Sequence, residues 1–318
     1  GDIAYNFLGW YFDEQYTKEA KAPLTVTSDI TLFAKWSDSV DLSMFDILDL
    51  GNSSGYSVRV RTVAKNDITG SVTVPMRYGG ELIVRIETNG FEDCINITQL
   101  TVPDSVTIVG NYAFQGCKSL EKIVLPDSLK QIGAYAFKNC EKLSDVNFPS
   151  QIISINADIF RTAPLMQEKL EQDENGMFYW GTAFLGKSCY VKGKKVEDNE
   201  TTSLTVRQGT TVAAVYSLYY MNALKEVTFA DSVRYLPSNV FEDSEKCVVE
   251  TINLPASYED AMTLTTFFPS SVKTLTLDES NENFSIVNGC LIRNKDMQLI
   301  ASTAQATAIP DGTVIIGK

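Results

Sequence analysis

Residues 112–117 read YAFQGC and residues 135–140 read YAFKNC, so nearly the same six letters occur twice, 23 positions apart. A proline stands 11 positions before the phenylalanine of each copy, and a third pair follows at the same interval. The three pairs are Pro103 with Phe114, Pro126 with Phe137, and Pro149 with Phe160. The chain therefore repeats a unit of 23 residues.

A short segment with alternating character precedes each proline and recurs farther along the chain. Its outer two residues are apolar and its middle residue is usually Thr or Asn, as expected for a half-buried β-strand. The segments are LTV (100–102), IVL (123–125), VNF (146–148), LTV (204–206), VTF (227–229), INL (252–254) and LTL (275–277). The spacing between segments is too short for a long helix, so we expect one strand and one tight, partly helical return per repeat.

A period of about 20 to 29 residues with one strand per unit is typical of leucine-rich repeats. No unit of such a solenoid can bury its apolar face alone, so each stacks on the next. The predicted fold class is an α+β solenoid: a leucine-rich repeat with a stacked parallel β-sheet and short helical or irregular returns. With strands about 4.8 Å apart, eight or nine rungs would form one ladder roughly 40 Å long.

The run from Leu120 to Cys140 has the pattern L-x-x-I-x-L-P-x-S-L-x-x-I-G-x-x-A-F-x-x-C. It resembles the leucine-rich repeat of BspA-like bacterial surface proteins. The match is strong from about residue 100 to 160 and traceable from about residue 58 to the C-terminus. The resemblance implies a non-enzymatic, adhesin-like module, at the bacterial cell surface or secreted, that binds a host-surface or other extracellular protein.

Residues 7–36 are similar to the second half of the InlB B-type (Listeria–Bacteroides) repeat. The G-W-Y start (9–11) and the V-T-S-D-I-T-L-F-A-K-W finish (26–36) carry this similarity. It implies a small N-terminal β module, a partial repeat over 1–37. Because the first half of that repeat is missing, we expect the chain to be a piece of a longer surface protein.

The remaining organisation follows from the same pattern. We expect a linker and N-terminal cap over 38–70, and the solenoid over 71–318. Inserts at about 164–203 and 279–306 interrupt the repeat. The first should hold a short amphipathic helix (165–170) and a hairpin around Trp180-Gly181, and the second a hairpin with its turn at 294–296.

Composition excludes several classes of function. Lys and Arg number 27 against 40 Asp and Glu, a net charge of −13, which disfavours nucleic acid and anionic lipid as partners. The chain has no histidine and no C-x-x-C pair, which removes the Ser-His-Asp and Cys-His arrangements and the usual zinc sites. No stretch reaches the ~18 apolar residues of a membrane span. We therefore expect no catalytic residue, metal, cofactor, nucleic-acid partner or membrane insertion within this chain.

Three of the six cysteines, Cys94, Cys117 and Cys140, recur at one repeat position and should stack in a column. A disulfide between neighbouring rungs is one interpretation, since a rung spacing of ~4.8 Å suits the Cα separation of a disulfide. A ladder of small buried thiols is the other, and we favour it because three cysteines in a row leave one unpaired.

The candidate binding site is the face of the sheet that points away from the core, because strand side chains alternate between faces. The candidate residues are Thr101, Lys122, Val124, Asp145, Asn147, Thr205, Glu226, Thr228, Thr251, Asn253, Thr274 and Thr276. Solenoids commonly bind through this face. The alternative is a solvated surface whose threonines serve strand propensity.

A second candidate is the aromatic pair Tyr179 and Trp180, whose rings could stack on sugars. Such residues more often close the edge of a core. This pair would make the chain a carbohydrate-binding module of the bacterial cell envelope, and a spacer is the remaining alternative. Glycan is therefore a possible partner besides protein.

Overall fold

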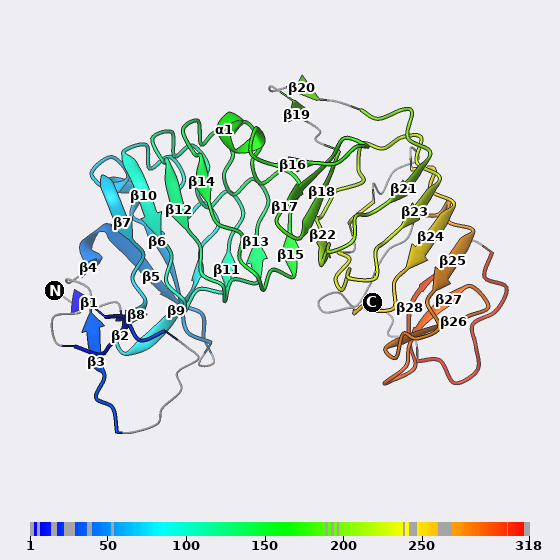
Figure 1. The fold of residues 1–318 in the computed structure, drawn as a ribbon, viewed down its shortest axis with the longest axis horizontal. Coiled ribbons are helices and arrows are strands. Elements are labelled where there is room, and N and C mark those ends of the chain that lie inside the picture. Colours follow the sequence, from blue (N-terminus) through cyan, green and yellow to red (C-terminus); the bar gives the residue numbers. More distant parts are fainter. Residues whose placement is uncertain are drawn as a thin grey trace.

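The computed structural model describes most of the chain. The described residues are 3–4, 7–13, 18–21, 29–36, 40–51, 54–187, 190–191, 194–195, 197–237, 239–241, 247–259, 269–303 and 305–314. They form a β-solenoid in which successive rungs, one per repeat, stack in parallel (Figure 1). The predicted leucine-rich repeat architecture is confirmed.

The repeated strands form a parallel sheet that is divided into two blocks. The first block contains β7 (Gly70–Thr73), β10 (Ile97–Thr101), β12 (Lys122–Val124) and β14 (Asp145–Val146). The second contains β21 (Ser203–Thr205), β23 (Glu226–Thr228), β24 (Thr251–Leu254) and β25 (Thr274–Leu277). Gln99 pairs with Lys122 and Ser203 pairs with Glu226, so the 23-residue period is also a hydrogen-bonding register.

A second parallel ladder, the return ladder, runs through the segments that bring the chain back. It contains β9 (Glu81–Ile86), β11 (Ile108–Val109), β13 (Gln131–Ile132) and β15 (Ser154–Ile155). On its N-terminal side lie β5 (Phe45–Asp49), β6 (Tyr56–Val60) and β8 (Arg77–Tyr78). The core of each rung lies between the two ladders.

The returns that were expected to be partly helical are turns. Tyr112 and Tyr135 have φ values of 56° and 58°, a left-handed conformation that interrupts a right-handed helix. Helices among the described residues are confined to α1 (Pro164–Gln167), η1 (Leu42–Met44) and η2 (Thr62–Ala64). The amphipathic helix expected over 165–170 is thus reduced to α1.

A hairpin from the first insert separates the two strand blocks. Its strands are β16 (Glu171–Gln172), β17 (Met177–Trp180) and β18 (Ala183–Lys187), and β18 pairs in parallel with β22 (Val212–Ala213). The predicted hairpin around Trp180-Gly181 is confirmed. In Figure 1, β17 and β18 lie between the block ending at β14 and the block beginning at β21. We call β17 and β18 the septum hairpin.

Side chains of the septum hairpin enter two different cores. Tyr179 and Phe184 pack with the core of the C-terminal half, whereas Trp180 and Leu185 pack with the core of the N-terminal half. Since strand side chains alternate between faces, the hairpin is buried on both sides. The expectation of one continuous strand ladder is wrong for this reason.

Further antiparallel groups of strands lie near the N-terminus, after β18 and near the C-terminus. The C-terminal one contains β26 (Phe284–Val287), β27 (Cys290–Arg293) and β28 (Gln298–Ser302), and the predicted turn at 294–296 joins the last two. The others are β1 (Ile3–Ala4) with β4 (Val40–Asp41), β2 (Phe7–Tyr11) with β3 (Phe33–Trp36), and β19 (Tyr190–Val191) with β20 (Lys194–Lys195).

Repeated phenylalanines fill one interior column. The rings of Phe91, Phe114, Phe137 and Phe160 follow one another with centroid separations of 5.6, 5.3 and 5.4 Å, and all four are buried. The last two contacts are stacked, with interplanar angles of 9° and 15°. Each ring therefore contacts the equivalent ring of the neighbouring rung.

The cysteine column is a ladder of buried free thiols, as favoured. The thiols of Cys117 and Cys140 each donate a hydrogen bond of 3.1 Å to a phenylalanine carbonyl of the preceding rung. Burial raises the pKa of Cys94 and of Cys140 to about 12, so these thiols stay protonated at neutral pH. Cys189 lies outside the described residues.

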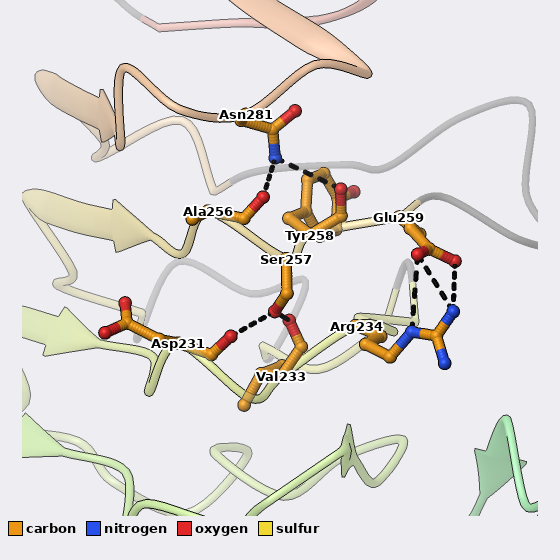
Figure 2. Close-up of polar contacts among 8 residues, drawn as sticks. All are labelled: Asp231, Val233, Arg234, Ala256, Ser257, Tyr258, Glu259 and Asn281. Atoms are coloured by element: carbon orange, nitrogen blue, oxygen red, sulfur yellow. Dashed lines mark hydrogen bonds and ion pairs between the residues drawn. The ribbon is translucent and has the colours of Figure 1, made fainter.

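A serine two positions after the anchor of several repeats ties its rung to the one before. The Ser257 hydroxyl contacts the carbonyls of Asp231 and Val233, the latter at 2.9 Å (Figure 2). Ser128 makes the same contacts one block earlier, at 2.7 and 3.3 Å. In the rung that contains β25, Asn281 has the role that serine has in the others. Its side-chain amide donates to the Ala256 and Tyr258 carbonyls of the preceding rung at 2.9 and 3.2 Å.

Replacing Ser257 with Ala is expected to lower the free energy of unfolding by about 1 to 2 kcal/mol, because it leaves the Val233 carbonyl without its hydroxyl donor. Urea unfolding followed by circular dichroism measures this loss. The matched control is Ser280→Ala, because Ser280 is exposed and its hydroxyl bonds only within its own turn, to Asp278. Equal losses in both variants would contradict a role for Ser257 in joining rungs.

Candidate interaction surface

The structure places the twelve predicted residues on two separate faces. We call the outward side of β10, β12 and β14 the N-terminal face and the outward side of β21, β23, β24 and β25 the C-terminal face. Nine of the twelve are exposed, and Thr228, Thr251 and Asn253 are half-buried. The septum hairpin lies between the blocks, so the candidates do not form one surface.

On the N-terminal face, Lys122 and Asp145 form an ion pair of 2.9 Å across neighbouring strands. Val124 lies beside Thr101 in register and is 40% exposed. Asn147 has a structural task, because its side-chain amide accepts from the Leu125 N–H at 2.8 Å and donates to the Leu125 carbonyl at 2.7 Å. The strand predicted over 146–148 therefore ends at Val146. At the next position the Asn147 side chain, instead of its backbone, bonds to the neighbouring strand segment.

The C-terminal face carries a hydrogen-bonded row of side chains. The Asn253 amide donates to the Thr228 hydroxyl at 2.9 Å and to the Glu226 carboxylate at 3.1 Å, and it accepts from the Thr276 hydroxyl at 2.6 Å. These contacts join β23, β24 and β25. The row is thus held in place before any ligand arrives, and its ends, near Thr205 and Thr276, are exposed.

Sequence reasoning missed the first strand of the N-terminal face, β7. Residues 72–75 read VTVP, much like LTVP at 100–103, but the two copies lie 28 residues apart rather than 23. A search at a fixed spacing of 23 residues therefore does not find the copy at 72–75. Ser71, which pairs with Gln99, extends the exposed face by one strand.

Sequence comparison assigns the family. The model of the BspA type leucine rich repeat region matches six copies, over residues 83–179 and 194–312, which is more than half of the chain. The chain belongs to the BspA-type leucine-rich repeat family. No curated protein sequence matches it.

Solved leucine-rich repeat structures are similar to this BspA-type chain. The T. pallidum leucine rich repeat protein TpLRR is 19% identical, with 75% of this chain and 83% of that one covered and a TM-score of 0.35. A leucine-rich repeat protein from Bacteroides ovatus is 18% identical, with coverages of 75% and 53% and a TM-score of 0.36. The pneumococcal vaccine antigen PcpA is 14% identical, with coverages of 85% and 90% and a TM-score of 0.29.

The family match begins at residue 83, so the similarity of residues 7–36 to the InlB B-type repeat stays a prediction. The structure pairs β2 with β3 in this region, and residues 14–17 and 22–28 lie outside the described part. The division into segments 1–37, 38–70 and 71–318 stays a prediction as well.

The aromatic pair of the BspA-type chain is part of its core. Tyr179 is 0% exposed and Trp180 is 7% exposed. The Trp180 ring packs edge-on against Phe148 and Phe160, with centroids 5.1 and 5.0 Å away. The Arg207 guanidinium covers Tyr179 at 4.0 Å from the ring centroid. Neither ring therefore offers the exposed face that sugar stacking needs, because the septum hairpin is buried on both sides.

Within the described residues, acidic and cysteine side chains form no group of three that could hold a metal ion. The same residues include no helix with the length and hydropathy required to cross a membrane. BspA-type repeats are generally non-enzymatic scaffolds for protein interaction.

Proposed function

We propose that this BspA-type chain is a non-enzymatic binding module, at the bacterial cell surface or secreted, that recognises a host or neighbouring-cell protein through the exposed C-terminal face of its sheet. The observation that carries the proposal is the row of Glu226, Asn253 and Thr276 on the C-terminal face. Its side chains are fixed by cross-strand hydrogen bonds, so a ligand does not have to order them, which lowers the entropic cost of binding.

The test is a pair of double variants. Thr205→Arg with Thr228→Arg places two charges on adjacent strands of the C-terminal face, and Thr101→Arg with Val124→Arg does the same on the N-terminal face. We expect the first to weaken binding to an immobilised panel of purified extracellular-matrix proteins by at least about tenfold, since an unpaired buried charge costs more than 1.4 kcal/mol. The second should leave binding unchanged. Surface plasmon resonance measures both.

Unfolding curves of the two double variants serve as the control for folding. If both bind as tightly as the parent chain, the C-terminal face is a solvated surface and the proposal fails. Loss on the N-terminal variant alone also contradicts the assignment. The alternative of a carbohydrate-binding or spacer module no longer draws support from Tyr179 and Trp180, because both are buried.

A further inference from the structure

A pocket of about 360 Å³ lies on the return ladder, away from both sheet faces. Arg85, Gln131 and Ser154 line one side of it, and they belong to a single row that crosses β9, β11, β13 and β15 in register. Three strand steps of ~4.8 Å make this row roughly 14 Å long. We call it the return-face pocket.

Two glycines line the pocket where successive rungs pack closely. A Cβ on Gly110 would lie 2.5 Å from the Thr88 nitrogen, and one on Gly133 would lie 2.5 Å from the Asn111 nitrogen. Close packing of one rung on the next therefore requires glycine at both positions. The backbone of both glycines also lines the pocket.

Arg85 is unusual among the arginines of the chain. It is half-buried, yet among the eight arginines it is the only one whose guanidinium makes no hydrogen bond, ion pair or ring contact with the described residues. Arg234, by contrast, holds the Glu259 carboxylate at 2.9 Å (Figure 2). A partly desolvated guanidinium without an anion is a site for a carboxylate, which it can bind in a bidentate manner.

The other groups of the pocket favour a sugar over a peptide. The backbone of β11 and β13 is paired with parallel neighbours on both sides, so an extended peptide cannot add to it as a strand. Recognition must use side chains, and besides aliphatic residues the pocket is lined by amides, a hydroxyl and Tyr216, which is 40% exposed. Amides and hydroxyls both donate and accept, as a ligand rich in hydroxyl groups requires.

We infer that the return-face pocket binds an acidic oligosaccharide, with a sugar carboxylate on Arg85 and the sugar ring farther along the pocket against Tyr216. This site is independent of the proposed protein-binding face. The ligand class follows from Arg85, whose guanidinium has no partner among the described residues, and from the row it shares with the apolar Ile108 and the neutral polar Gln131 and Ser154.

The test uses galacturonate oligosaccharides and their methyl-esterified forms, which carry the same sugars without the charge. Isothermal titration should show that Arg85→Gln weakens binding of the acidic form by about tenfold or more and leaves the esterified form unchanged. The matched control is Arg59→Gln, which removes an equal charge from the adjacent β6 and should not alter binding. Tyr216→Asn, in which the new residue tolerates the left-handed backbone, should weaken both forms equally.

The inference is overturned by no binding of the acidic form by the parent chain, by equal loss in Arg85→Gln and Arg59→Gln, or by equal affinity for the acidic and esterified sugars. Tighter binding of an oligoglutamate peptide than of galacturonate would also overturn it, since the pocket would then be a site for acidic peptides. Thermal unfolding confirms that each variant is folded.

Discussion

A Gly186→Ala variant is expected to lose about 3 to 5 kcal/mol of its free energy of unfolding. Gly186 lies in β18 with φ of 81°, and a Cβ there would be 1.7 Å from the Ser217 carbonyl oxygen. The clash is with backbone, so no side chain can move aside. Either the septum hairpin or the turn after β22 must shift by about 1.3 Å to reach 3.0 Å, and both belong to the junction of the two cores.

The matched control is Gly209→Ala. Gly209 has nearly the same backbone conformation, with φ of 85°, but a Cβ there meets nothing within 4 Å. It should lose only about 1 to 2 kcal/mol, the cost of the left-handed conformation. Urea unfolding followed by circular dichroism and by tryptophan fluorescence compares the two. The junction is not a point of tight packing if both variants unfold at the same urea concentration.

Much of the fold follows from the sequence, because every repeat of a solenoid has the same local structure, one strand and one return. The 23-residue period fixes which residues pair, as the register of Gln99 with Lys122 shows. It does not show where the ladder is interrupted. Trp180 and Tyr179 are neighbours in sequence but belong to different cores, and only the tertiary placement of the hairpin decides that.

The candidate sites were less visible for a physical reason. Alternation identifies the outward positions of each strand, and nine of twelve are exposed. It cannot reveal that Asn147 bonds to the backbone of Leu125, because this depends on where β14 ends. Arg85 gave no sequence signal, since its importance lies in the absence of a partner among the described residues.

The phenylalanine column decides how strongly neighbouring rungs are coupled. Phe137 stacks on Phe114 at 5.3 Å and on Phe160 at 5.4 Å, and it is fully buried. In a solenoid each rung contacts only its neighbours, so a cavity here weakens two interfaces at once.

Replacing Phe137 with Ala is therefore expected to lower the free energy of unfolding by about 3 to 5 kcal/mol, and Phe137→Leu by less than about 1.5 kcal/mol, because leucine keeps most of the buried volume. Guanidinium unfolding of the two variants gives the difference. Phe12→Ala is the control for loss of an aromatic ring, since Phe12 is 44% exposed and outside the column. A loss in Phe137→Ala no larger than in Phe12→Ala would mean that the stack contributes little, and that the two ladders alone hold the rungs together.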